Sequence, residues 1–185
     1  ILERKEKLGI RILNISVGAC SKRGMSENSA LVKGVNRAWD AGLVVVVAAG
    51  NNGPRTMSIT TPGISRKVIT VGCSDDDREV LVGGNRMVDY SGRGPTAACI
   101  CKPDLVAPGC SVVSCSSRAD KYTIKSGTSM STPIVSGAVA LLLERFPDMT
   151  NKDVKLRLRE SSVDIGLPRN QQGWGLLDVG KMIGK

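Results

Sequence analysis

The sequence predicts an α/β fold in which a parallel sheet has helices on its faces. Short β-type segments alternate along the chain with helical segments, an order that is typical of strand–helix–strand units. One of them, residues 43–49 (LVVVVAA), is apolar on both faces, as expected of a central parallel strand. The chain has 185 residues, 41% of them hydrophobic, and no internal repeat or long linker divides it. We therefore treat residues 1–185 as one unit.

The first half of the chain is predicted to alternate helices and strands. Residues 1–8 form a polar helical segment that Gly9 ends. A β-rich segment follows at residues 11–17, and Gly18 ends it. Residues 26–41 have helical spacing with one apolar face, made of Leu31, Val35, Ala38 and Trp39.

The second half contains the most apolar helix of the chain. Residues 132–146 are apolar nearly all round, which predicts a buried helix, and Pro133 suits its first turn. Thr150 and Asp153 resemble a capping box that opens a last helix at residues 151–161. Strands are expected at residues 67–72, 105–107 and 111–114, with loops and a short hairpin within residues 74–103.

The composition excludes several kinds of chemistry. The sequence contains no histidine, so this chain alone cannot hold a Ser-His-Asp or Cys-His catalytic unit or a histidine-ligated metal. Aromatic residues make up only 3% of the chain, too few for a base-stacking surface. The net charge is +9, but the basic residues are scattered, which argues against a nucleic-acid partner. No apolar run approaches the ~20 residues of a membrane span, and we expect no membrane partner.

The start of the chain lacks the features of a natural N-terminus. It opens without methionine and without a basic segment followed by an apolar one. Residues 1–5 (ILERK) read like the middle of a helix, so residue 1 is expected to be a cut point within a longer protein.

The six cysteines do not predict a metal site. There is no Cys-x-x-Cys motif and no histidine to complete a mixed zinc site. Cys20, Cys73 and Cys101 lie in or beside apolar runs and are expected to be small buried residues. The sequence leaves disulfide pairing and redox compartment open, for these three and for Cys99, Cys110 and Cys115.

A serine precedes the buried helix in a glycine-containing turn. Residues 126–133 (SGTSMSTP) place Ser129 where the free N–H groups and the positive end of a helix can stabilise an anion beside its hydroxyl. Taken alone, this segment favours a serine that caps the helix.

An asparagine follows the most apolar strand. Asn51 lies just past residues 43–49, at the edge where open α/β sheets bind their ligands. Its amide could donate a hydrogen bond to a developing oxyanion. Taken alone, it is also an ordinary turn residue.

Together with Ser129 and Asn51, seven ordered motifs resemble the subtilisin-like serine proteases. Residues 127–133 (GTSMSTP) resemble the family's nucleophile motif, and residues 47–51 (VAAGN) its oxyanion-asparagine motif. Residues 14–18 (NISVG) are similar to the strand that lines the first specificity pocket. The others, in family order, are 61–63 with 68–72 (TPG, VITVG), 91–95 (SGRGP), 102–109 (KPDLVAPG) and 173–175 (GWG).

The resemblance implies a role for each candidate residue and a three-layer fold. Ser129 would be the nucleophile, and Asn51 would donate to the oxyanion together with the Ser129 backbone N–H. The backbone of a peptide or protein substrate would pair with the segment of Ser16, Val17 and Gly18. The substrate side chain before the scissile bond would enter a pocket whose wall is made of Ala48, Ala49 and Gly50. Thr61–Pro62 matches a position that is often a cis peptide in the family.

The family's Asp and His motifs are absent from this sequence. In the family they precede every motif found here, so the chain is expected to be the C-terminal part of the catalytic domain, with four strands of the sheet. Residues 11–17 would form its exposed edge. The missing N-terminal part of the domain is then a required partner, and the fragment alone is expected to be inactive.

Some alternatives stay open at this stage. A full-length relative that has lost catalysis and works as a binding or signalling scaffold would have the same features. The resemblance requires no cofactor. Calcium is common in the family and is a possible ligand, but Arg66 and Lys67 lie beside the candidate carbonyl ligands near Gly63 and Val68 and would repel a cation. The resemblance also implies a secreted protein.

Overall fold

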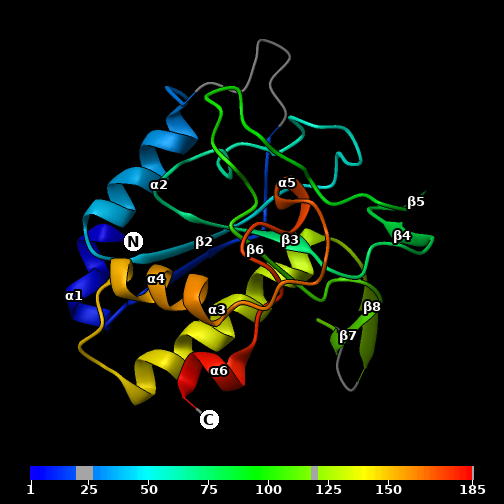
Figure 1. Ribbon diagram of the computed structural model, residues 1–185. Coiled ribbons are helices and arrows are strands. Elements are labelled where there is room, and N and C mark those ends of the chain that lie inside the picture. Colours follow the sequence, from blue (N-terminus) through cyan, green and yellow to red (C-terminus); the bar gives the residue numbers. More distant parts are fainter. Residues whose placement is uncertain (20–26, 118–120, 185) are drawn as a thin grey trace.

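The computed structural model describes residues 1–19, 27–117 and 121–184. Its centre is a parallel sheet with strand order β1-β2-β3-β6, and Figure 1 shows α2 on one side of these strands and α3 on the other. The predicted three-layer α/β fold is therefore confirmed. The four strands are β1 (Ile12–Ile15), β2 (Val44–Ala48), β3 (Ile69–Cys73) and β6 (Leu105–Ala107).

The central and edge strands differ in burial. All residues of β2 are buried between its neighbours β1 and β3. β1 pairs only with β2 among the described residues, and its side chains are half-buried except for Asn14, which is exposed. This confirms four strands in the described part of the sheet, with the edge strand within the predicted residues 11–17 but limited to residues 12–15.

Helix α2 (Ala30–Asp40) starts at Ser29, whose side chain accepts a hydrogen bond from the Val32 backbone N–H at 3.3 Å. The prediction placed Leu31 on the buried face, but Leu31 is 50% exposed and Val32 is buried instead. The buried face of the helix is made of Val32, Val35, Ala38 and Trp39, so Leu31 lies beside this face and not on it. The predicted start at residue 26 lies outside the described residues.

Helix α3 (Thr128–Arg145) contacts all four strands of the sheet. The prediction started it at residue 132, which is wrong, because Gly127 caps the helix and Thr128 is its first residue. Pro133 is therefore past the first turn, where it removes one backbone hydrogen bond. Leu141, predicted to be buried, is 50% exposed, since only part of the helix surface faces the sheet.

Smaller elements complete the fold. Gly9 ends α1 (Lys5–Leu8) in a left-handed conformation, and the predicted capping box of Thr150 and Asp153 opens α4 (Asn151–Ser161). The expected hairpin is formed by β4 (Val80–Val82) and β5 (Asn85–Met87). The short helix η1 (Leu2–Arg4) also falls within the helical segment predicted at residues 1–8. The sequence did not predict three short elements: β8 (Tyr122–Lys125), which pairs with β7 (Val112–Cys115), α5 (Arg169–Gln172) and α6 (Val179–Ile183).

The cysteines only partly follow the prediction. Cys73 is buried, as expected. Cys101 is exposed, because it lies in a loop and not in a buried strand. Cys20 lies outside the described residues, and the five cysteines that the structure describes are free. In the same part of the chain, no helix is long and apolar enough to cross a bilayer.

Candidate active site

The N-terminus of α3 meets the carboxyl end of β2. Gly127, the N-cap of α3, has a φ of 140°, which side chains other than hydrogen rarely allow. A Cβ at this position would lie 3.2 Å from Asn51 Nδ2. Glycine therefore lets the start of the helix approach Asn51, and it places Ser129 in the first turn.

Hydrogen bonds fix the orientation of Asn51. Its Oδ1 accepts from the Thr128 backbone N–H and from Thr128 Oγ1, both at 3.0 Å. The same hydroxyl accepts from the Gly50 backbone N–H at 3.1 Å. The carbonyl end of the Asn51 side chain is thus committed, and the amide end is the one that can donate to a ligand.

The Ser129 hydroxyl is half-buried and donates to the backbone carbonyl of Ser16 at 2.8 Å. This bond connects the N-terminus of α3 with the segment that follows the edge strand β1. A peptide carbonyl cannot take the proton from a serine hydroxyl, so the bond positions Ser129 without activating it.

The two predicted substrate-binding segments both pack against Thr60. A Cβ on Gly18 would lie 2.2 Å from Thr60 Oγ1, and one on Gly50 would lie 2.4 Å from Thr60 Cγ2. Beyond Gly18, Ala19 exchanges backbone hydrogen bonds with Thr61, at 2.9 and 3.2 Å. Ser16 is half-buried, Val17 is 71% exposed, and the wall residues Ala48 and Ala49 are buried.

These contacts bring the eight predicted residues together at the carboxyl ends of the strands. Thr128 and Thr60 were not assigned a role from the sequence. Thr128 is part of the nucleophile motif, but its bonds to Asn51 appear only when residues 77 positions apart meet. No sequence signal marks Thr60.

The peptide bond between Thr61 and Pro62 is cis, as the resemblance implied.

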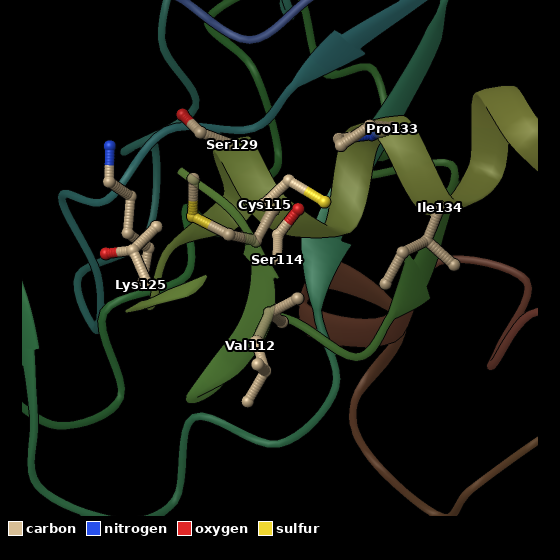
Figure 2. Close-up of a pocket in the computed structure, with 10 residues that line it drawn as sticks. Val112, Ser114, Cys115, Lys125, Ser129, Pro133 and Ile134 are labelled. Carbon is tan, nitrogen blue, oxygen red and sulfur yellow. The ribbon is translucent and has the colours of Figure 1, made fainter. Parts of the chain in front are cut away.

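A cavity of about 390 Å³ lies beside Ser129. Figure 2 shows Ser129 and Lys125 on one side of it, Cys115 and Val112 from β7, and Pro133 and Ile134 from α3. Met130 also lines it, and most of the surface is apolar. Ser129 therefore borders an open and mostly apolar surface in this chain.

A buried polar cluster supports the site from below. The Gly109 carbonyl accepts from the Gly127 backbone N–H at 2.9 Å and from the Tyr90 hydroxyl at 3.2 Å. The Gly109 backbone N–H donates to Asp75 Oδ1 at 2.8 Å. Burial raises the pKa of the neighbouring Cys73 thiol to about 12, which favours its protonated form. The cluster fixes the loop against which Gly127 rests.

Residues 2–175 match the model of the Subtilase family. The chain belongs to the subtilase family. The serine protease AprX of Bacillus subtilis (strain 168) is 40% identical over 83% of this chain, which covers 38% of AprX. Subtilisin DY of Bacillus licheniformis is 34% identical over 92% of this chain, which covers 56% of that protein.

Two solved structures are similar to this chain over most of its length. Sphericase superimposes with a TM-score of 0.77 at 29% identity, over 96% of this chain and 60% of that one. A psychrophilic protease, S41, gives a TM-score of 0.74 at 27% identity, also over 96% of this chain and 60% of that one. This subtilase chain therefore spans about two fifths to three fifths of the length of these four relatives.

Proposed function

We propose that this chain supplies the nucleophile and oxyanion half of a serine endopeptidase site. The arrangement of Asn51, Thr128 and Ser129 is the observation that supports this most strongly. Ser129 Oγ attacks the scissile peptide carbonyl and forms a tetrahedral intermediate. Its oxyanion accepts hydrogen bonds from the Asn51 amide and the Ser129 backbone N–H. No cofactor takes part.

The substrate binds as an extended strand. The backbone of Ser16, Val17 and Gly18 pairs with it, which fits a segment whose middle side chain is exposed. The side chain before the scissile bond lies against Ala48, Ala49 and Gly50. These residues are small, so the pocket accepts large apolar side chains.

The base that activates Ser129 comes from outside this chain. The sequence has no histidine, so the proton of the Ser129 hydroxyl has no histidine acceptor here. We propose that the N-terminal part of the same domain supplies an Asp and a His and packs against this chain. The outer edge of β1 and the apolar cavity beside Ser129 are the surfaces that fit this partner.

A labelling and complementation experiment tests the proposal. A fluorophosphonate reacts with activated serines, so we expect no rapid labelling of the 185-residue chain alone. Addition of an N-terminal subtilase fragment with its Asp and His motifs should restore labelling at Ser129 and peptide hydrolysis. An S129A chain is the matched control. Rapid labelling of the chain alone, or a folded complex without activity, would contradict the proposal.

The alternative is a scaffold that has lost catalysis. The network around Asn51 and Ser129 favours a protease, because a binding scaffold has no need to keep an oxyanion donor oriented. Secretion remains part of the proposal, and fractionation of cells that produce the full-length protein would test it.

A further inference from the structure

Lys102 is a buried lysine that the proposed protease mechanism does not use. It lies just before β6 and is 1% exposed. Its Nζ donates to the Val68 carbonyl at 3.0 Å and to the carboxylate of Asp104, which is also buried. Lysines are almost never buried without a partner, since desolvation of the ammonium is costly. The Val68 carbonyl and the Asp104 carboxylate are the partners that stabilise the buried ammonium group of Lys102.

A second lysine reaches the same place from α4. Lys155 Nζ donates to the carbonyls of Val68, Lys67 and Arg66, at 2.9, 3.0 and 3.1 Å. It also lies 3.5 Å from Asp104 Oδ1. Two ammonium groups thus converge on three consecutive backbone carbonyls and one carboxylate.

This cluster of oxygen atoms has the composition of a hard-cation site. Backbone carbonyls and a carboxylate are the ligands that calcium prefers. The residues present do not fit a calcium ion, however, because Lys102 and Lys155 already bond to these oxygens. The Gly63 carbonyl is also engaged, since it accepts from Thr70 Oγ1 at 2.7 Å. The sequence analysis expected Arg66 and Lys67 to repel a cation from this place. In the structure, the ammonium groups next to the carbonyls are those of Lys102 and Lys155, and the backbone carbonyls of Arg66 and Lys67 accept hydrogen bonds from Lys155.

We propose that the ammonium groups of Lys102 and Lys155 replace a metal ion and brace the segment 63–68 from inside. Asp104 links the brace to β3, because its Oδ2 also accepts from the Thr70 backbone N–H at 2.7 Å. The braced segment lies behind the predicted pocket wall, where a Cβ on Gly63 would be 3.0 Å from the Ala48 carbonyl. The pocket wall is then held in place without calcium, a consequence that rests on the proposed function.

Thermal unfolding of the purified full-length protein tests this inference. The change in Tm of the wild type between EDTA and calcium chloride serves as the reference, because it includes any calcium site elsewhere in the protein. K102E combined with K155M removes both ammonium groups and adds a carboxylate, so the Tm of this double variant should fall in EDTA and rise with calcium by about 5–10 °C more than the wild type does, at a calcium concentration far above Kd. K152E combined with K155M has the same charge change but places the carboxylate at an exposed position of α4, and its Tm should respond to calcium as the wild type does.

K102M distinguishes the charge from the volume of the side chain. It fills the space without a charge and leaves Asp104 without its buried partner, so its Tm should be lower than that of the wild type in every buffer. A double variant K102E/K155M that responds to calcium no more than the wild type, or a K102M protein as stable as the wild type, would each overturn the inference. These readouts are independent of peptidase activity, so they separate this inference from the proposed function.

Discussion

Asn51 and Ser129 lie at the same junction of β2 and α3, but the chain holds them in different ways. Thr128 fixes Asn51 with two hydrogen bonds and is itself bonded to Gly50. Ser129 has one hydrogen bond, to a carbonyl beside the edge strand, and borders an open cavity. A hydrogen-bond donor can be oriented by the backbone around it, whereas a nucleophile needs a base. In the proposed function, the oxyanion side of the site is therefore complete within this chain, and the nucleophile side is not.

The largest expected effect is on the Ser129 side. In the complemented or full-length protein, S129A should lower kcat by about 10⁶-fold, the size known for loss of the nucleophile in subtilisin, a relative. Tm should hardly change. The matched control is S131A, two residues further along α3, because the described residues offer no hydrogen-bond partner for its buried Oγ. If S131A were equally inactive, helix distortion and not loss of the nucleophile would explain the result.

Substitution of Asn51 should lower kcat less than substitution of Ser129, and its effect on kcat can be separated from its effect on stability. N51D keeps the oxygen that accepts from Thr128 but replaces the amide donor, so kcat should fall by about 10²–10³-fold, the size found in subtilisin, with the fold preserved. N51L loses both functions and should also lower the free energy of unfolding by about 1–3 kcal/mol. Steady-state kinetics and denaturant titration of both variants check this. Equal activity of N51D and wild type would exclude Asn51 as the oxyanion donor.

Thr128 should matter for position and not for chemistry. T128V removes the hydroxyl that bonds to Asn51 and Gly50, which leaves the Gly50 N–H without that acceptor. We expect a loss of about 1–3 kcal/mol in the free energy of unfolding and a drop in kcat smaller than that of N51D. T128S keeps the hydroxyl and should restore both. A T128V enzyme slower than N51D would contradict the order proposed for the two residues.

The smallest effect is expected far from both sides, at the start of α4. T150A removes the helix cap and should cost about 1 kcal/mol of stability with kcat unchanged. Hydrogen bonds from Thr150 lower the pKa of Asp153 in the folded state. This contribution to stability is thus present above the normal aspartate pKa and is lost as the pH falls through the lowered pKa. Denaturant titrations at neutral and at strongly acid pH should show the difference between wild type and T150A shrink.

Much of the fold was predictable because local signals agree with it. Strand β2 is a continuous apolar run, and the capping box of α4 matches its sequence signature residue by residue. The start of α3 was not predictable in the same way. Its N-cap and first turn contain glycine, threonine and serine, which favour caps and turns, and their long-range hydrogen bonds to Asn51, Ser16 and Gly109 cannot be read from the sequence.

The candidate site was predictable as a set of residues but not as a structure. Ser129 and Asn51 were found from their motifs, whereas the role of Thr128 as the support of Asn51 depends on long-range packing. The same limit applies to Lys102. A lysine is expected at the surface, and only the fold reveals the carbonyls and carboxylate that let it be buried.

The hydrogen bonds of the site also have a consequence for the timing of folding. Thr128 and Asn51 are 77 positions apart, and Ser129 and Ser16 are 113 apart. Contacts that close such long loops are entropically costly and form after local structure. We therefore expect Ser129 and Asn51 to meet only when the sheet and α3 have assembled. Under the proposed function, a newly made or partly unfolded molecule would then have no assembled site with which to cleave its neighbours.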